Sequence, residues 1–97
     1  MPTWETTARF EKDIRALGSD QLGRFRTCIA EKFVAGLSDP PFLPGLRVKG
    51  VQGYPGVFEM TWAPDGRATF EYGEEIEPAE PHIVWRRVGT HDIFYAP

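Results

Sequence analysis

The end of the chain holds the side chains best suited to acid–base and anion chemistry. The run from His82 to Pro97, HIVWRRVGTHDIFYAP, contains both histidines, the adjacent Arg86 and Arg87, and Tyr95. A histidine side chain titrates near neutral pH and can act as a general acid or base. An arginine presents a planar fork of donors that suits phosphate oxygens. We therefore expect the rest of the chain to position this stretch.

Length and composition predict a single small domain, residues 1–97, in the cytoplasm. A chain of 97 residues with 41% hydrophobic and 13% aromatic side chains can form one core and argues against global disorder. Its net charge of −3 and pI near 5.3 give no overall attraction to nucleic acid, so any basic site must be local. The single cysteine suits a reducing compartment, and no membrane-spanning or secretion segment is recognised.

Residues 1–37 are predicted to form an antiparallel helical hairpin. Apolar positions recur every three or four residues from Thr3 to Leu17, and again from about Asp20 to Ala35. Gly18 separates the two patterns and suits the end of the first helix. The first stripe comprises Trp4, Thr7, Phe10 or Glu11, Ile14 and Leu17.

Residues 45–97 are predicted to contain a sheet and the C-terminal site. Beyond the proline-rich crossing, residues 38–45, alternating apolar residues predict strands at 46–51, 57–63, 67–72 and 82–88, with a tight turn at APDGR. The predicted fold class is α+β, with the helical hairpin packed on one face of a four-stranded, mainly antiparallel sheet. The opposite face is expected to carry Arg47, Lys49, Thr61, Arg67 and Glu71.

The last predicted strand leaves the two adjacent arginines unassigned to a face. Its apolar residues occupy both alternating positions. If Trp85 shares a face with Ile83, then Arg87 lies on that face and Arg86 on the other. Either arginine could therefore reach the site.

Two groups of charged residues are better explained as solvated surface than as sites. Arg24 and Arg26 could indicate nucleic-acid binding, but interleaved acids such as Glu31 favour a solvated helix face. The simplest interpretation of the acidic segment 73–81 is an exposed loop, and the alternative is an acidic docking patch.

The order of the segments PGLRVKGVQG, VFEMTW, GRATFEY and WRRVGTHDIF resembles the RelE/ParE superfamily of bacterial toxins over nearly the whole chain. The likeness is strongest to the YafQ-like and HigB-like branch, in which a late strand ends in a GTH motif followed by an aromatic. Here the motif is Gly89, Thr90 and His91, with Tyr95 four residues past the histidine. The resemblance implies a RelE-like fold and the toxin of a type II toxin–antitoxin system. Such a toxin is an mRNA interferase, a ribosome-dependent endoribonuclease paired with a cognate antitoxin protein.

RNA can be cut without a metal or cofactor when its 2′-hydroxyl attacks the adjacent phosphate, and we expect neither group here. The reaction needs proton removal, proton donation and charge stabilisation. His91 could transfer a proton, Arg67, Arg87 and Lys49 could bind the phosphate, and Tyr95 could stack on a base. These five residues form the predicted catalytic set.

Four further residues are predicted to contact the substrate: Arg47, Arg86, Asp92 and Phe94. Asp92 could set the tautomer of His91 or cap the turn. His91 could itself be an ordinary turn histidine bonded to backbone, and His82 is expected to be structural, without zinc-ligand spacing.

Two other functions stay open from the sequence. One is a binding module that keeps the toxin scaffold but does not cleave, and that acts on a protein target such as gyrase. The other is a folded partner protein without toxicity. The acidic balance of the chain is compatible with both.

Overall fold

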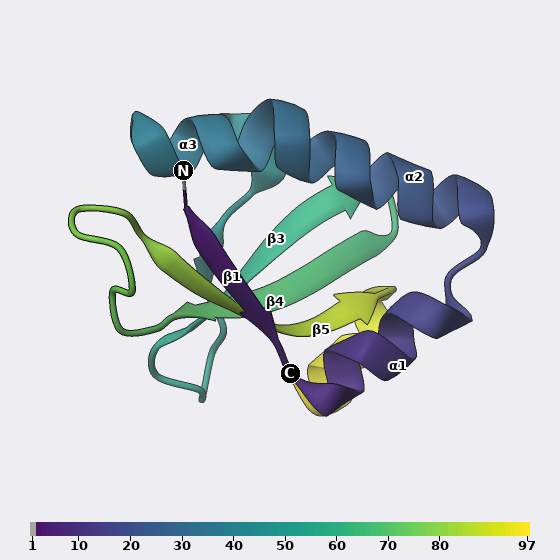
Figure 1. The fold of residues 1–97 in the computed structure, drawn as a ribbon. Coiled ribbons are helices and arrows are strands. Elements are labelled where there is room, and N and C mark those ends of the chain that lie inside the picture. Colours follow the sequence, from purple (N-terminus) through teal and green to yellow (C-terminus); the bar gives the residue numbers. More distant parts are fainter. Residues whose placement is uncertain (1) are drawn as a thin grey trace.

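The alternating apolar residues of the C-terminal half form the centre of a five-stranded mixed sheet (Figure 1). The computed structural model describes residues 2–97. The strand order is β1-β5-β4-β3-β2, with β1 parallel to β5 and the other neighbours antiparallel. The strands are β1 (Thr3–Thr6), β2 (Lys49–Gly50), β3 (Val57–Ala63), β4 (Gly66–Tyr72) and β5 (His82–Gly89).

The helices share one core with this sheet, because Phe10 of the first helix contacts both Phe25 of the next helix and Trp85 of β5. In Figure 1 a long helical rod crosses above the strands, whereas the shorter α1 lies beside β5. Among residues 2–97, none of the helices is long and apolar enough to cross a membrane. The helical segments are α1 (Ala8–Ala16), α2 (Ser19–Cys28), the π-helical η1 (Ile29–Phe33), α3 (Val34–Ser38) and the 3-10 turns η2 (Pro44–Leu46) and η3 (His91–Tyr95).

The α+β class is confirmed, but the prediction of a four-stranded sheet and an N-terminal hairpin starting at Thr3 was wrong. Residues Thr3–Thr6 form β1, and α1 begins only at Ala8. The Thr7 side chain caps α1 by accepting a hydrogen bond from the backbone N–H of Phe10 at 3.1 Å. Trp4 fitted the helical spacing, yet it packs on Trp85 as a strand residue.

The predicted strand at 46–51 is also mostly a turn. Leu46 ends the 3-10 turn η2 and is buried, and Arg47 follows with a left-handed φ of 50°. Only Lys49–Gly50 pair with β3. Because a left-handed residue breaks the alternation of a strand, Arg47 and Lys49 lie on different local structures.

The core is dominated by aromatic rings between the sheet and the helical rod. Phe33 is fully buried and its ring centroid lies 5.0 Å from those of both Phe70 and Trp85. Phe25 meets Trp85 and Trp62 edge-on at 5.7 and 5.6 Å. These edge-to-face and tilted contacts add to the free energy of burying each ring.

A bulge in β5 decides where the two arginines point. Thr69 pairs with Arg87 and Phe70 pairs with Trp85, so Arg86 is an extra residue on β5. Trp85 and Val88 lie in the core, whereas the side chains of both arginines bond to groups outside it. The strict alternation assumed from the sequence was therefore wrong, and both arginines reach the side of the sheet away from α2.

His82 is structural, as expected. Its ring is only 3% exposed and joins β5 to β1. Nδ1 lies 2.7 Å from the Thr3 hydroxyl and Nε2 lies 2.7 Å from the Glu5 carboxylate. The side chain thus fastens the parallel edge strand that the sequence did not predict.

Replacing the two histidines should therefore affect stability differently. We expect His82→Ala to lower the free energy of unfolding by about 2–4 kcal/mol, because it leaves a cavity and removes two hydrogen bonds. His91→Ala, at an exposed turn, should change it by less than about 0.5 kcal/mol. Urea unfolding followed by tryptophan fluorescence measures both, and equal effects of the two substitutions would contradict this assignment.

Candidate functional site

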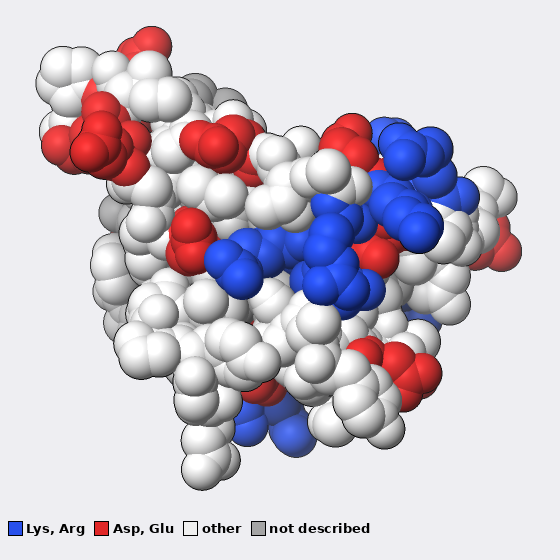
Figure 2. All heavy atoms as spheres, turned by 90° about the horizontal axis from the view of Figure 1, so that it is seen from below, with Lys and Arg blue, Asp and Glu red and all other residues white. Residues whose placement is uncertain are grey.

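The face of the sheet away from α2 carries a band of basic side chains. Figure 2 views the molecule from that side and shows Lys and Arg gathered across the surface, with acidic side chains beside them. Strand pairing aligns Lys49, Glu59, Thr69 and Arg87 in one row across β2, β3, β4 and β5. Three strand spacings separate the ends of this row, so Lys49 and Arg87 lie about 14 Å apart.

Arg87 is held by a carboxylate from α1. Its Nε and Nη2 donate to the two carboxylate oxygens of Asp13 at 2.7 and 3.2 Å, and its Nη1 donates to the Ala96 carbonyl at 3.0 Å. Asp13 also accepts the backbone N–H of Val88 at 3.1 Å. The bonds of Arg87 engage all three nitrogens of its guanidinium. The pair is also mostly buried, because the Arg87 and Asp13 side chains are only 15% and 17% exposed.

Arg86 and Lys49 also have carboxylate partners. Arg86 donates from Nη1 to Glu71 at 3.0 Å and from Nε to the Pro97 carbonyl at 3.1 Å. Lys49, which is largely exposed, lies 3.9 Å from the Glu59 carboxylate. Exposed pairs of this kind contribute little to stability, but they reduce the positive charge offered to a ligand.

Arg67 secures the turn between β3 and β4. Its Nη1 donates to the carbonyls of Ala63, Pro64 and Gly66 at 3.3, 3.3 and 2.9 Å. The Trp62 indole N–H donates in turn to the Arg67 carbonyl at 2.9 Å. Because these contacts use only Nη1, the Nε and Nη2 donors of Arg67 stay available within the described part of the chain.

His91 begins a short exposed turn directly after β5. Its ring meets Phe94 edge-on at 4.9 Å, and Tyr95 is 91% exposed. The Thr90 hydroxyl caps the turn by accepting the Asp92 backbone N–H at 3.3 Å. Within residues 2–97 no hydrogen bond joins the Asp92 carboxylate to His91, and Thr90 rather than the Asp92 side chain supplies the cap. The four side chains from His91 to Tyr95, without the buried Ile93, line a hollow of about 210 Å³.

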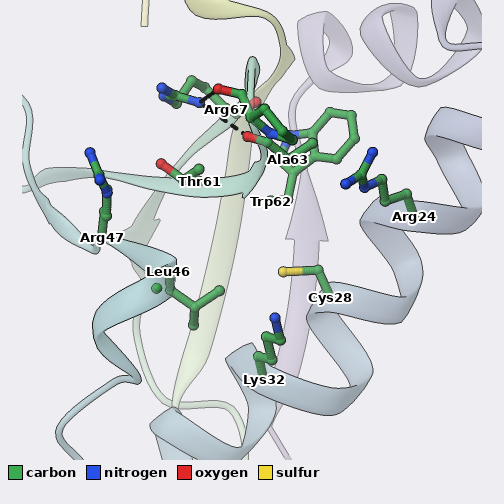
Figure 3. Close-up of a pocket in the computed structure, with 11 residues that line it drawn as sticks. Arg24, Cys28, Lys32, Leu46, Arg47, Thr61, Trp62, Ala63 and Arg67 are labelled. Carbon is green, nitrogen blue, oxygen red and sulfur yellow. Dashed lines mark hydrogen bonds between the residues drawn. The ribbon is translucent and has the colours of Figure 1, made fainter.

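A larger hollow lies at the edge of β3, between the helical rod and the residues after η2. It measures about 390 Å³, and Figure 3 shows Arg24, Cys28 and Lys32 on one side of it and Arg47 on the other. We call this site the basic hollow, and its four basic residues are Arg24, Lys32, Arg47 and Arg67. Within residues 2–97 none of these four forms an ion pair with a carboxylate.

Cys28 lines the same hollow. Burial raises the pKa of the Cys28 thiol, and the nearby Lys32 ammonium acts in the opposite direction. A raised pKa makes the thiol a weak nucleophile, so its side chain contributes mainly to the wall of the hollow.

The structure separates the nine predicted site residues into groups. Arg47 and Arg67 line the basic hollow, and Arg86 and Arg87 line a separate hollow of about 240 Å³ with the C-terminal residues. His91, Asp92, Phe94 and Tyr95 share the turn. Lys49 lines none of these hollows. Pairing of Arg67 with Gly89 brings the first group next to the turn, because Gly89 precedes His91 by two residues.

Sequence reasoning missed the partner of Arg87 and half of the basic hollow. Asp13 lies 74 residues before Arg87, and nothing in the spacing joins them. Arg24 and Lys32, in contrast, share a helix face with Cys28 because the three residues are four apart. A run of two cations and a small apolar residue on one helix face was therefore the signal available.

Comparison with known proteins supports the same architecture. No family model matches the chain, and no curated protein matches it in sequence. A solved structure of the Escherichia coli DinJ-YafQ complex matches with a TM-score of 0.72 and 13% identity, over 99% of this chain and 100% of that one. A copper-bound mutant toxin from Helicobacter pylori matches at 0.68 and 17%, over 95% and 97%. A YoeB/ParE toxin from Agrobacterium tumefaciens matches at 0.66 and 11%, over 92% and 98%.

The chain therefore has the fold of the RelE/ParE toxins. Among these structures, YafQ is matched over nearly the full length of both chains. The resemblance found in the sequence, including its YafQ-like branch, is confirmed at the level of the fold.

Breaking the pair between Asp13 and Arg87 should strongly destabilise the fold. We expect Asp13→Asn to lower the free energy of unfolding by about 3 kcal/mol, because it leaves a mostly buried guanidinium without its countercharge. The double variant Asp13→Leu with Arg87→Met should recover part of that loss, because it removes the unpaired charge but leaves the Val88 N–H without its acceptor. Denaturant unfolding measures each variant, with Glu75→Gln in the exposed loop as a neutral control. A double variant no more stable than Asp13→Asn would contradict this role.

Proposed function

We propose that the protein is the toxin of a type II toxin–antitoxin pair and that it cuts messenger RNA on the ribosome. The observation that carries the proposal is the position of His91. On a fold shared with YafQ, its exposed turn follows β5 directly and lies beside the strand that bears Arg67. A small antitoxin protein encoded nearby is the proposed partner.

The proposed reaction uses the RNA's own 2′-hydroxyl as nucleophile. The 2′-oxygen forms a bond to the adjacent phosphorus while the bond to the 5′-oxygen breaks, which yields a 2′,3′-cyclic phosphate and a 5′-hydroxyl. A base must take the 2′-hydroxyl proton, and an acid must give one to the leaving oxygen. We assign one of these two transfers to His91, whose ring is exposed and free to approach the strand.

Two neighbouring residues support this step. The free Nε and Nη2 donors of Arg67 can bind phosphate oxygens, while its Nη1 keeps the guanidinium in place on the turn. Tyr95 is nearly fully exposed and can stack on a base, which would orient the strand. Asp92 and Phe94 are proposed to contact the substrate from the same turn.

Arg87 and Arg86 are assigned a positioning role. Both donate to carbonyls of the last two residues, Ala96 and Pro97, and so hold the chain that follows the His91 turn. Each is also paired with a carboxylate. Lys49 lies at the far end of the row across the sheet and is proposed to attract the RNA from a distance.

The second candidate is a binding module that keeps this fold without cleavage. The observation that favours it is the pairing of Lys49, Arg86 and Arg87 with carboxylates. Such a module would act on a protein target, for example gyrase. A folded partner without toxicity is the third candidate.

Cleavage of a defined message in a translation extract tests the proposal. We expect the wild-type protein to cut the message only when ribosomes are present, and His91→Ala to lower the rate by about 10²–10⁴-fold, as for loss of a general acid or base. The unfolding curve of His91→Ala should match that of the wild type, which would show that the lower cleavage rate comes from lost catalysis and not from lost folding.

The other outcomes separate the candidates. Growth arrest on induction with intact messages would contradict cleavage and favour the binding module. Cleavage that persists in His91→Ala would contradict the assignment of His91. A protein that neither arrests growth nor cuts RNA would be the partner without toxicity.

A further inference from the structure

The outer edge of β1 carries backbone groups that the sheet does not use. β1 is the last strand of the sheet and pairs only with β5. The backbone N–H groups of Thr3 and Thr7 both donate toward the β5 chain at 3.0 Å. Because alternate residues of a parallel strand face the same neighbour, Trp4 and Thr6 turn their N–H and C=O groups away from β5. An edge of this kind can pair with a strand of another chain.

Of the two edges of the sheet, β1 is the less protected. The edge at β2 has two residues, one of which is Lys49, and short strands and lysines keep an edge from pairing. β1 has four residues, TWET, without lysine or proline. Its Trp4 side chain is 40% exposed although it stacks on Trp85. Burial of the exposed part of this ring would favour association with another chain.

An apolar hollow of about 710 Å³ lies beside the same strand, between α1 and the helical rod. Trp4 forms part of its wall, and the half-buried Ile14, Leu22 and Ile29 leave apolar surface in contact with water. Figure 1 shows β1 in front of the sheet, with the rod above it and α1 following its lower end. One partner can therefore cover the strand and the hollow together.

The charges of this hollow suit a second copy of the same chain. Its charged lining residues, within the described part of the chain, are Glu11 on α1 and Arg26 on the rod. They have opposite signs, and neither has an ion-pair partner within residues 2–97. In a two-fold dimer each surface meets its own copy, so a surface with one charge of each sign is not repelled.

The side chains of β1 favour one register for two copies. Two β1 strands related by a two-fold axis run antiparallel, and their outward-facing residues form the hydrogen-bonded pairs. An axis at Glu5 would set two carboxylates directly opposite each other, which is destabilising. An axis at Trp4 sets the two tryptophans opposite each other and each Glu5 opposite Thr3 of the second copy. Aromatic cross-strand pairs are stabilising.

We propose that two copies of the chain associate through antiparallel pairing of their β1 strands, with the two-fold axis at Trp4 and the apolar hollows of both copies in the interface. The pairing joins two five-stranded sheets into one continuous sheet. It removes the exposed edge and covers both Trp4 rings. The inference does not rest on the proposed cleavage, because it uses none of the residues assigned to the reaction.

Cysteine cross-linking tests the register. Cys28→Ala removes the native thiol, and Trp4→Cys is then compared with the matched control Thr6→Cys under mild oxidation. At the axis the two Cα atoms lie about 5.5 Å apart, which suits a disulfide. Two residues at position 6 would lie about 14 Å apart, which does not. We expect Trp4→Cys to form covalent dimers at least about tenfold faster. Equal rates for the two variants, or no dimer from Trp4→Cys, would overturn the proposed register.

Sedimentation equilibrium of the full chain tests the dimer itself. We expect the mass of the wild type to rise with concentration from 11.0 kDa to twice that value. Trp4→Lys sets two like charges at the axis and should weaken the dimer at least about tenfold. Tyr72→Lys, which replaces an equally exposed aromatic on β4, should stay within about twofold of the wild type. Thr6→Lys is a second test on an exposed side chain that does not contribute to the core, and should weaken the dimer about threefold or more.

Three outcomes would overturn the proposal. The first is a wild-type chain that stays monomeric up to roughly 200 µM. The second is equal weakening by Trp4→Lys and Tyr72→Lys, which would mean general charge repulsion. The third is a monomer that binds the protein of a neighbouring gene and loses that binding in Trp4→Lys and Thr6→Lys, which would assign the β1 edge to that protein.

Discussion

The bulge at Arg86, and the two side chains at α1 that satisfy it, hold the candidate site together. An extra residue in β5 frees backbone groups that no neighbouring strand can reach. The Thr7 hydroxyl donates to the Arg86 carbonyl at 2.8 Å, and the Asp13 carboxylate accepts the Val88 N–H. The same Asp13 carboxylate accepts hydrogen bonds from the Arg87 guanidinium, and Arg87 in turn donates to the carbonyl of Ala96 after the His91 turn. One short helix therefore fixes both the strand that leads to His91 and the chain that follows it.

The parts of the fold that could be predicted are those set by local pattern. The strands β3 and β4 and the turn between them follow from strict alternation and the APDGR sequence, and the long helix follows from its apolar stripe. The strand β1 could not be predicted, because Trp4 and Thr7 happen to fit helical spacing and the strand depends on pairing with residues near His82. The positions of Arg86 and Arg87 could not be predicted either, since a bulge is decided by tertiary contacts rather than by alternation.

The candidate site shows how an acidic chain can offer local positive charge. Within residues 2–97 some Lys and Arg side chains pair with a carboxylate and others do not. The net charge of −3 therefore hides an uneven distribution of positive charge over the surface. The exposed loop 73–81 carries several of the glutamates and lies between β4 and β5 in the sequence, before the strand that leads to His91. Four cations without carboxylate partners, Arg24, Lys32, Arg47 and Arg67, line the hollow where the helical rod meets the edge of β3. Predictions from total charge alone miss this arrangement, whereas the spacing of Arg24 and Lys32 on one helix face points to it.

The proposed cleavage leaves chemical marks on its products, and these marks provide the most direct measurement. Attack by the 2′-hydroxyl yields fragments with a 2′,3′-cyclic phosphate on one side of the cut and a 5′-hydroxyl on the other. Mass spectrometry of a short message incubated with the protein and ribosomes identifies both ends. We predict cyclic-phosphate and 5′-hydroxyl ends that appear only with ribosomes. Fragments with 5′-phosphate ends, or a message that stays intact while growth stops, would contradict the account.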